Sequence, residues 1–224
     1  MCGRFTLASP DPSQIRARFP IGERLEVRRR YNVAPGDDVL AVVHRGSQPE
    51  GALLRWGLVP HWASDPRELG VTTINARAET IAERPLYRDA FARKRCLIVA
   101  DGFYEWSGGA PHWITREDGE PFAFAGLWAS WRPRSPDAVE PLRSCTIVTT
   151  AATGPVRDLH DRVPVILPRA AEHAWLHPDT PAPELHGLLV PSATLVTRPV
   201  SRAVNDARHD APDCLDPPEQ AALF

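Results

Sequence analysis

The 224-residue sequence predicts a β-rich α+β domain with a curved, barrel-like, mostly antiparallel sheet and peripheral helices. Short apolar, β-branched or aromatic segments outnumber helical patterns, and turn residues separate them. Strands and helices also lack the regular alternation of a doubly wound fold. Because 43% of the residues are hydrophobic and no repeat or linker divides the chain, we expect one domain over residues 1–205. The Pro- and Asp-rich composition of residues 206–224 predicts a disordered tail.

The individual elements follow from local patterns. Apolar, β-branched or aromatic character predicts strands at residues 39–44, 52–56, 96–100, 122–128, 145–149, 163–167 and 194–200. Helical spacing of apolar residues, with capping residues at the first segment, predicts helices at residues 9–19, 86–95 and 169–176 and a short one at 154–159.

Composition excludes several classes of protein. No apolar run reaches the roughly 18 residues of a membrane span, and the first residues lack a signal-peptide pattern, so we expect a cytoplasmic protein. Four cysteines stand at positions 2, 96, 145 and 214, and none has CxxC spacing, so we expect no metal site and no cofactor. The net charge of −2 does not indicate a nucleic-acid binder, although arginine supplies every basic residue except Lys94.

Cys2 is the cysteine with an unusual context. Removal of Met1 would place an α-amine and a thiol on one residue, and an α-amine has a pKa of about 7.7–8.0, so part of it is neutral at pH 7. A neutral amine attacks an aldehyde to give a Schiff base, and the thiol can then close a five-membered thiazolidine ring. Because both nucleophiles belong to Cys2, the second step is intramolecular.

Three further segments carry groups suited to acid–base or phosphate chemistry. Asn75 can hydrogen-bond a sugar oxygen, and Arg77 can bind a phosphate, although the same segment also fits a loop that enters a helix. Glu105 is flanked by aromatic residues, which favours a raised pKa and proton transfer. His160 precedes a predicted strand together with Arg162, a combination that suits a general acid or base beside a phosphate.

Six of the seven tryptophans fall between residues 56 and 131, and aromatic faces stack on the bases of single-stranded nucleic acid. Most are expected in the core. Trp62 follows the segment Val59-Pro60-His61, has the most loop-like context, and is the candidate for contact with bases.

Together these segments resemble the SRAP family, the SOS response-associated peptidases that shield abasic sites by DNA–protein crosslinking. The resemblance covers roughly residues 1–205 through seven segments in order: Met1-Cys2-Gly3-Arg4-Phe5, Arg30-Tyr31-Asn32-Val33-Ala34-Pro35-Gly36, Arg55-Trp56-Gly57-Leu58-Val59-Pro60, Asn75-Ala76-Arg77-Ala78-Glu79-Thr80, Gly102-Phe103-Tyr104-Glu105-Trp106, His160-Asp161-Arg162-Val163-Pro164 and Pro199-Val200-Ser201. Each motif alone is modest, and the ordered set is specific.

The resemblance implies a thiazolidine between Cys2 and the ring-opened abasic sugar of single-stranded DNA. It implies that Asn75 orients the sugar and Cys2, that Glu105 is the acid/base near the Cys2 amine, and that His160 helps to open the sugar ring. It further implies a DNA cleft that is lined by Arg4, Asn32, Arg77 and Arg162. Abasic-site lyase activity and cysteine-type removal of the protein's own N-terminal residues are also implied.

One departure from the family concerns the two adjacent aromatic residues that many relatives carry, because here the pair is His61-Trp62. We expect a monomer that acts without a metal or a membrane and associates with the nucleoid when it acts on DNA.

Three rival functions stay open on the sequence. They are an N-terminal-nucleophile amidotransferase or hydrolase, a cysteine peptidase that acts on other proteins, and a DNA-binding module without covalent chemistry.

Overall fold

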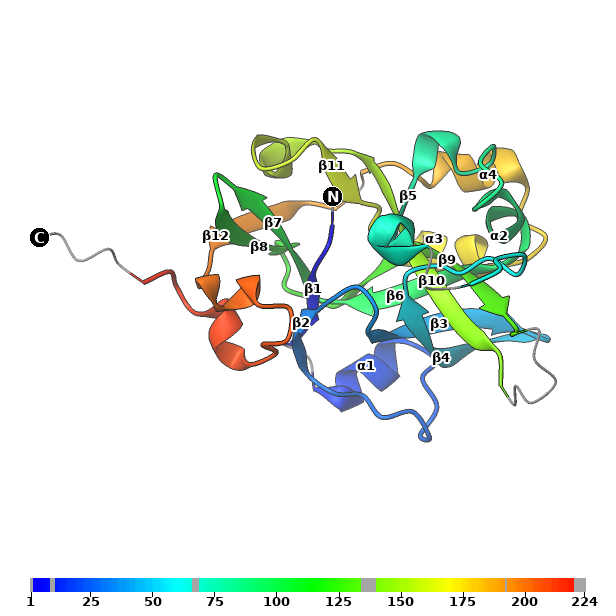
Figure 1. Ribbon diagram of the computed structural model, residues 1–224, viewed down its shortest axis with the longest axis horizontal. Helices are drawn as coiled ribbons and strands as arrows, with labels where there is room; N and C mark the ends of the chain where they lie inside the picture. The colour runs from blue at the N-terminus through cyan, green and yellow to red at the C-terminus, as the bar shows by residue number, and fades with distance from the viewer. Residues whose placement is uncertain (1, 9–10, 66–68, 134–139, 192, 220–224) are drawn as a thin grey trace, which may run out of the picture.

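A ring of strands forms the centre of the molecule (Figure 1). The computed structural model describes residues 2–8, 11–65, 69–133, 140–191 and 193–219, which contain two β-sheets and four α-helices. The larger sheet has the order β11-β10-β4-β3-β6-β9, and β9 also pairs with β10, so the sheet closes. Its strands are β3 Asp38–Arg45, β4 Gln48–Trp56, β5 Asn75–Arg77, β6 Arg95–Ala100, β9 Phe122–Trp131, β10 Leu142–Ala151 and β11 Arg162–Pro164.

The smaller sheet lies beside the ring and is antiparallel throughout, in the order β12-β8-β7-β1-β2. Its strands are β1 Phe5–Leu7, β2 Arg30–Val33, β7 Gly102–Ser107, β8 Ala110–Arg116 and β12 Leu195–Pro199. In the larger sheet only β10 makes parallel pairs among the described strands, with β4 and β5. The predicted α+β class with a barrel-like, mostly antiparallel sheet is therefore confirmed.

Helices cover the outside of the ring. They are α1 Pro12–Arg18, α2 Arg88–Arg93, α3 Arg169–Leu176 and α4 Ala182–Gly187, with 3₁₀ turns η2 Gly70–Thr73, η3 Ala78–Thr80, η4 Gly154–Asp158, η5 Arg202–Asn205 and η6 Pro212–Leu215. The start of α1 is set by a capping box, in which the Asp11 carboxylate accepts from the Ser13 amide and the Gln14 side chain accepts from the Asp11 amide. None of the helices in the described ranges is long and apolar enough to cross a membrane.

The predicted elements are largely confirmed. All seven predicted strands overlap observed strands, although the one at 163–167 is reduced to β11. Helices at 86–95 and 169–176 and the turn at 154–159 are present, and the first helix begins at Pro12 after residues 9–10, which lie outside the described ones. Five strands, β1, β2, β5, β7 and β8, were not predicted, because they are short or mix polar and aromatic residues. The short helix α4 was also not predicted.

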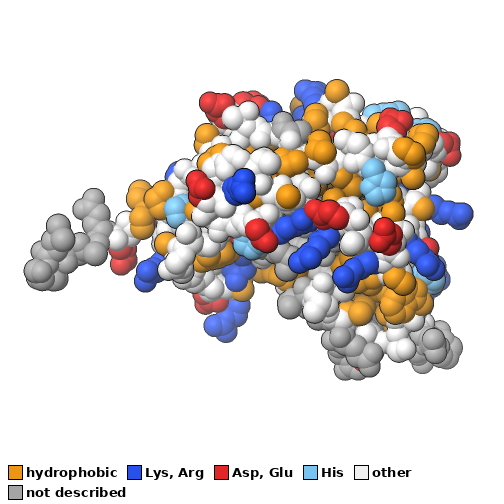
Figure 2. All heavy atoms as spheres, turned by 90° about the horizontal axis from the view of Figure 1, so that it is seen from above, with side chains coloured by type: hydrophobic (Ala, Val, Ile, Leu, Met, Phe, Trp, Pro, Cys, Tyr) orange, Lys and Arg blue, Asp and Glu red, His pale blue; other side chains and the backbone are white. Residues whose placement is uncertain are grey.

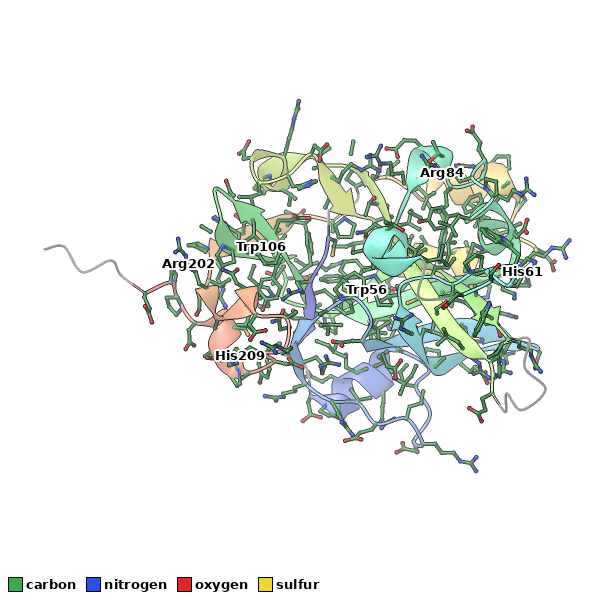
Figure 3. All side chains as sticks on the ribbon, in the orientation of Figure 1. Trp56, His61, Arg84, Trp106, Arg202 and His209 are labelled. Atoms are coloured by element: carbon green, nitrogen blue, oxygen red, sulfur yellow. The ribbon has the colours of Figure 1, made fainter. Side chains whose placement is uncertain are left out.

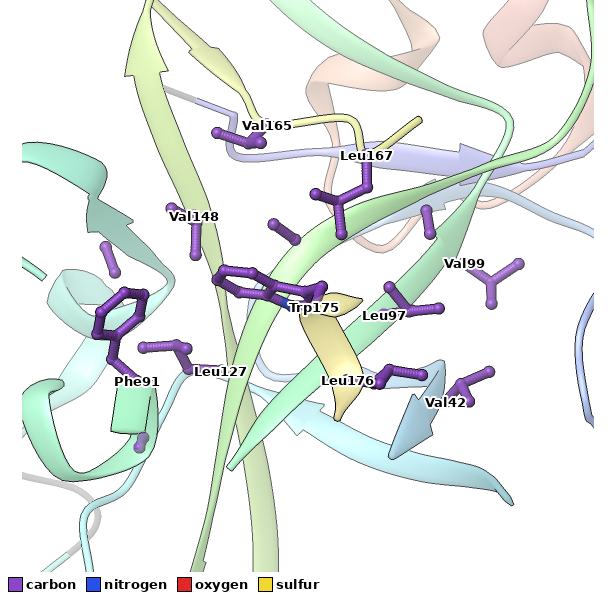
Figure 4. Close-up of a cluster of buried hydrophobic side chains, with 14 of the residues drawn as sticks. Val42, Phe91, Leu97, Val99, Leu127, Val148, Val165, Leu167, Trp175 and Leu176 are labelled. Atoms are coloured by element: carbon purple, nitrogen blue, oxygen red, sulfur yellow. The ribbon is translucent and has the colours of Figure 1, made fainter. Parts of the chain in front are cut away.

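Alternation along the ring strands places their buried side chains in two of the three hydrophobic clusters of the described residues. Ala41 and Ile98 face an inter-sheet cluster that includes Phe5 and Phe103 of the smaller sheet, whereas Val42 lies in a helix-side cluster. In Figure 4 the helix-side cluster gathers around the buried ring of Trp175 of α3. Full burial of each aliphatic side chain stabilises the fold by about 1.5–3 kcal/mol. Strands β3 and β6 are therefore buried on both faces, which explains their continuous apolar sequences.

The C-terminal segment is folded, which corrects the expected disorder of the tail. Residues 206–219 include η6 and pack on β2, while residues 220–224 lie outside the described ones. The Asp210 carboxylate accepts the backbone N–H groups of Tyr31 (2.5 Å) and Asn32 (2.9 Å) and pairs with the Arg30 guanidinium. Composition predicted disorder. The Asp210 carboxylate, however, accepts hydrogen bonds from the edge strand β2, and composition does not reveal such a tertiary contact.

Candidate functional site

Cys2 is completely buried and lies three residues before the start of β1 at Phe5. Its thiol donates to the carbonyl oxygen of Arg4, with a sulfur–oxygen distance of 3.8 Å, and its own carbonyl accepts the side-chain amide of Asn75 at 2.8 Å. Burial, and next the negative charge of Glu105, raise the pKa of the Cys2 thiol well above its ordinary value. The thiol is therefore protonated in the free protein, and it is not available as a thiolate nucleophile.

Glu105 reaches Cys2 through the pairing of β7 with β1. Phe103 pairs with Phe5, and the Tyr104 amide donates to the Arg4 carbonyl at 3.0 Å, so Glu105 lies beside the residues that precede β1. The Glu105 side chain is almost completely buried, and burial raises the pKa of its carboxyl. A buried carboxyl group with a raised pKa is suited to accept and return a proton.

The start of β7 is fixed by close packing that only glycine permits. A Cβ atom on Gly102 would lie 2.3 Å from the Trp113 indole nitrogen. That nitrogen donates to the Thr6 hydroxyl (3.1 Å), and the hydroxyl donates to the Asp101 carboxylate (2.6 Å). This chain of contacts ties β1, β7 and β8 together and sets the register that places Glu105 near Cys2.

Asn75 is held on β5, which pairs in parallel with β10 opposite Ile147. The Tyr87 hydroxyl donates to the Asn75 backbone carbonyl at 3.0 Å, and burial raises the pKa of Tyr87 to about 12, which keeps this donor protonated. The Asn75 amide nitrogen is used by the Cys2 carbonyl, whereas its buried side-chain oxygen has no hydrogen-bond donor among the described residues. That oxygen is available for a hydroxyl or amine of a ligand.

His160 lies between η4 and β11, and its orientation is set by its own turn. The Arg162 amide lies 2.9 Å from His160 Nδ1 and orients the ring. The Asp161 carboxylate is 2.8 Å from the same Nδ1 and is placed to pair with the ring when that nitrogen is protonated. A positive charge on the His160 ring would lower the pKa of Glu105, so the two predicted acid–base groups lie close enough to interact.

The Arg162 guanidinium is already engaged within the protein. It donates to both carboxylate oxygens of Glu79, at 2.6 and 2.8 Å, and to the Thr149 carbonyl at 2.7 Å. These bonds from Arg162 lower the pKa of Glu79. The buried Arg162 Nε has no hydrogen-bond partner among the described residues, and a phosphate would have to displace Glu79 to bind the two terminal nitrogens.

Asn32 and Arg4 occupy a different place from the one expected. Asn32 is completely buried, its amide nitrogen donates to the carbonyls of Val204, Asp206 and His209, and its oxygen accepts from Arg4 at 2.9 Å. Asn32 thus does not line a DNA cleft, because every polar atom of its side chain is bonded inside the protein. It instead positions the half-buried Arg4 guanidinium, which also donates to Val204.

Arg77 and Trp62 are exposed, as DNA-contacting residues must be. Trp62 has 50% of its surface exposed and lines a hollow of about 460 Å³ with Lys94 and Trp128, whose ring lies 5.3 Å from the lysine ammonium. Its neighbour His61 lies at the far end of the molecule from Trp106 and His209 (Figure 3). On the face in Figure 2, Lys and Arg side chains form a band with Asp and Glu side chains beside it, so the surface is not a single-sign basic patch.

The structure thus brings Cys2, Asn75, Glu105 and His160 together from four separate parts of the sequence. Two residues near this site were not predicted from the sequence. Tyr87 carries no local signal in the sequence. Glu79 lies in the first turn of η3, and nothing in the sequence indicates that it pairs with Arg162.

Comparison with known proteins gives a consistent result. Residues 1–207 match the family model described as SOS response associated peptidase (SRAP). "Abasic site processing protein YoaM" of Bacillus subtilis is 41% identical over 96% of this chain and 98% of its own, and "Abasic site processing protein YoqW" of the same organism is 40% identical over 96% and 99%. A crystal structure of a Bacteroides thetaiotaomicron protein has a TM-score of 0.82 over 96% of this chain and 99% of its own at 23% identity, which shows the same fold.

Proposed function

The chain belongs to the SRAP family, and on that premise we propose that it processes abasic sites in DNA by forming a covalent crosslink through Cys2. The substrate is the ring-opened abasic sugar in single-stranded DNA, and the product is a thiazolidine that shields the lesion. The observation that carries this proposal is the enclosure of Cys2 between the Glu105 carboxylate and the Asn75 amide.

The reaction begins with the sugar. His160 donates a proton to the ring oxygen, the C1′ hydroxyl gives its proton to water, and the hemiacetal opens to an aldehyde at C1′. Asn75 holds the Cys2 backbone through its nitrogen and offers its free oxygen to a sugar hydroxyl. His160 and Asn75 thus hold the aldehyde and the Cys2 amine in one enclosed site. Holding the two reacting groups together removes much of the entropic barrier to their reaction.

The amine reacts before the thiol. After Met1 is removed, Glu105 accepts a proton from the Cys2 ammonium, the neutral amine adds to C1′, and loss of water leaves an imine. The thiol then adds across the carbon–nitrogen double bond, so that sulfur bonds to C1′ and the thiol proton passes to nitrogen. Because burial raises the pKa of the Cys2 thiol, delivery of a protonated thiol to a preformed imine fits the site better than attack by a free thiolate.

A branch from the imine accounts for lyase activity. The imine makes the hydrogen on C2′ more acidic, and removal of that proton expels the 3′ phosphate by β-elimination. Ring closure by the Cys2 thiol withdraws the imine from this branch. Removal of the protein's own N-terminal residue would expose the amine, so self-processing peptidase activity serves the same chemistry.

DNA binding rests on the exposed Arg77 and Trp62 and on displacement of Glu79 from Arg162. An arginine contacts phosphate without reading bases, and a tryptophan face stacks on any base. The expected partner is therefore single-stranded DNA without sequence preference.

The test is a denaturing gel of the purified protein with a single-stranded oligonucleotide that carries one abasic site. We expect a slow-migrating band with wild type and none with Cys2→Ala. No band with wild type, or an equal band with Cys2→Ala, would refute covalent chemistry at Cys2. Retained binding without a band would support the DNA-binding module instead.

A second arm tests the requirement for a free amine. A short N-terminal extension that a specific protease removes to expose Cys2 keeps the thiol but converts the amine to an amide. Crosslinking should appear only after cleavage, and equal crosslinking before cleavage would assign the reaction to the thiol.

A further inference from the structure

Three potential metal ligands from the C-terminal segment lie together on the side of the molecule opposite His61 (Figure 3). They are the imidazole of His209, the carboxylate of Asp213 and the thiol of Cys214, and their ligand atoms all lie within 4.8 Å of one another. His209 Nε2 and the Asp213 carboxylate are 2.7 Å apart, and the Cys214 sulfur is 3.6 Å from the His209 carbonyl oxygen. None of these residues takes part in the site around Cys2.

The segment that carries these ligands is anchored at both ends. At the start of the segment, Asn32 Nδ2 donates to the His209 carbonyl at 2.7 Å, and the Asp210 carboxylate accepts from two backbone amides of β2. Beyond the segment, the Arg198 guanidinium donates to the Leu215 carbonyl at 2.8 Å. An anchored backbone loses little conformational freedom when its side chains bind an ion, which favours affinity.

The donor set suits a zinc-like ion. Nitrogen, oxygen and sulfur at bond lengths of about 2.0–2.3 Å place tetrahedral ligands about 3–4 Å apart, close to the present spacing. Cys214 is completely buried against Tyr104 and Val204, whereas His209 and Asp213 are partly or fully exposed, so an ion can enter from solvent and reach the sulfur. Residues 206–216 also hold four aspartates and one arginine, a charge balance that attracts a cation.

We propose that His209, Asp213 and Cys214 bind one divalent transition-metal ion of the zinc class, with water as a fourth ligand. On binding, the Cys214 thiol releases its proton to solvent, the imidazole binds through Nε2, and no redox change occurs. Asn32 donates a hydrogen bond to the His209 carbonyl and accepts one from Arg4. The bound ion therefore stabilises the segment whose contact with Asn32 helps to position Arg4. This metal site is separate from the proposed crosslinking and does not depend on it.

Cobalt(II) is the probe, because thiolate ligation gives it a charge-transfer absorption in the near ultraviolet. The titration uses protein with Cys2→Ala, so that the amine and thiol of Cys2 cannot chelate the ion. We expect the absorption to saturate at one equivalent and to disappear when zinc is added. His209→Ala and Asp213→Asn, both substitutions of exposed side chains, should weaken binding at least tenfold, and Cys214→Ser should abolish the band.

A matched control comes from another histidine cluster, in which the ring centroids of His173 and His177 are 5.6 Å apart. His173→Ala should bind cobalt like the parent. Zinc should also raise the Tm of the parent but not of His209→Ala. The proposal is overturned by the absence of a band, by a band that persists in Cys214→Ser, or by parental affinity in both His209→Ala and Asp213→Asn.

Discussion

Cys2 and Cys145 are both completely buried in the inter-sheet hydrophobic cluster, yet the polar groups beside them differ. Cys145 lies on β10, where it is opposite Trp56 of β4 and Trp128 of β9, and its backbone is part of the closed ring. Cys2 lies before β1, where Asn75 and Glu105 surround it. Burial raises the pKa of both thiols, so neither is reactive as a thiolate.

The difference teaches that burial alone does not make a cysteine functional. What distinguishes Cys2 is a neighbouring carboxylate and an amide that holds its backbone, and the proposed crosslinking adds the amine that removal of Met1 would expose. A core cysteine such as Cys145 has apolar neighbours and contributes packing only.

The largest expected effect comes from Cys2→Ser, which keeps the amine and removes the sulfur. We expect the denaturant-stable crosslink to disappear, because no thiol can close the ring, while the imine still forms. Borohydride reduction during the reaction should trap that imine as a band on a denaturing gel, and β-elimination should increase. Loss of the borohydride-trapped band as well would show that the thiol, and not the amine, makes the first bond.

Glu105→Gln should slow crosslinking by about 10²–10⁴-fold, because Gln cannot accept the ammonium proton. DNA affinity, measured by fluorescence anisotropy, should change little. The wild-type rate should fall as pH falls through the raised pKa of Glu105, and the variant should lack this dependence. An identical pH profile in the two proteins would remove Glu105 from the proton transfer.

The same substitution should stabilise the fold at neutral pH. A carboxyl whose pKa is raised by folding contributes stability below its unfolded pKa and loses that contribution as pH rises through its folded pKa. At pH 7, which lies above the unfolded pKa of a glutamate, Glu105 therefore costs stability, and Glu105→Gln should have the higher Tm, with the difference shrinking as pH is lowered. A lower Tm for the variant at pH 7 would contradict this.

Asn75→Ala should slow crosslinking by about 10²-fold, because a small displacement of the reacting groups has an effect of that size. Asn75→Asp is the matched control, since it keeps an oxygen but loses the nitrogen that donates to Cys2. If the Asn75 nitrogen is what matters, both variants should be slow on a gel time course. A fast Asn75→Asp would assign the effect to the oxygen instead.

The smallest effect is expected for Cys145→Ala. Loss of one buried sulfur should lower the free energy of unfolding by about 1 kcal/mol and the Tm by about 2–4 °C, with the crosslinking rate unchanged. Urea denaturation and the gel assay measure the two quantities. A crosslinking defect beyond the loss of folded protein would break the contrast between the two cysteines.

The sequence predicted the ring strands well, because their two buried faces produce continuous apolar runs such as residues 96–100. It failed for β5 and β7, whose polar residues belong to the site and obscure the strand pattern. The family resemblance also assigned Asn32 to the DNA cleft, and composition assigned residues 206–224 to a disordered tail, of which residues 206–219 are folded. Both errors have one cause, the contact between β2 and the C-terminal segment, which joins residues about 180 positions apart.

By itself the sequence determined the fold class, the family and the chemical identity of the groups around Cys2, since these depend on residue types and their order. Tertiary structure alone decided which of these groups meet. The pairing of β7 with β1 brings Glu105 to Cys2, and the pairing of β5 with β10 brings Asn75 to the same place. Strand register across distant segments is set by packing and hydrogen bonding of the whole sheet, so no local pattern specifies it.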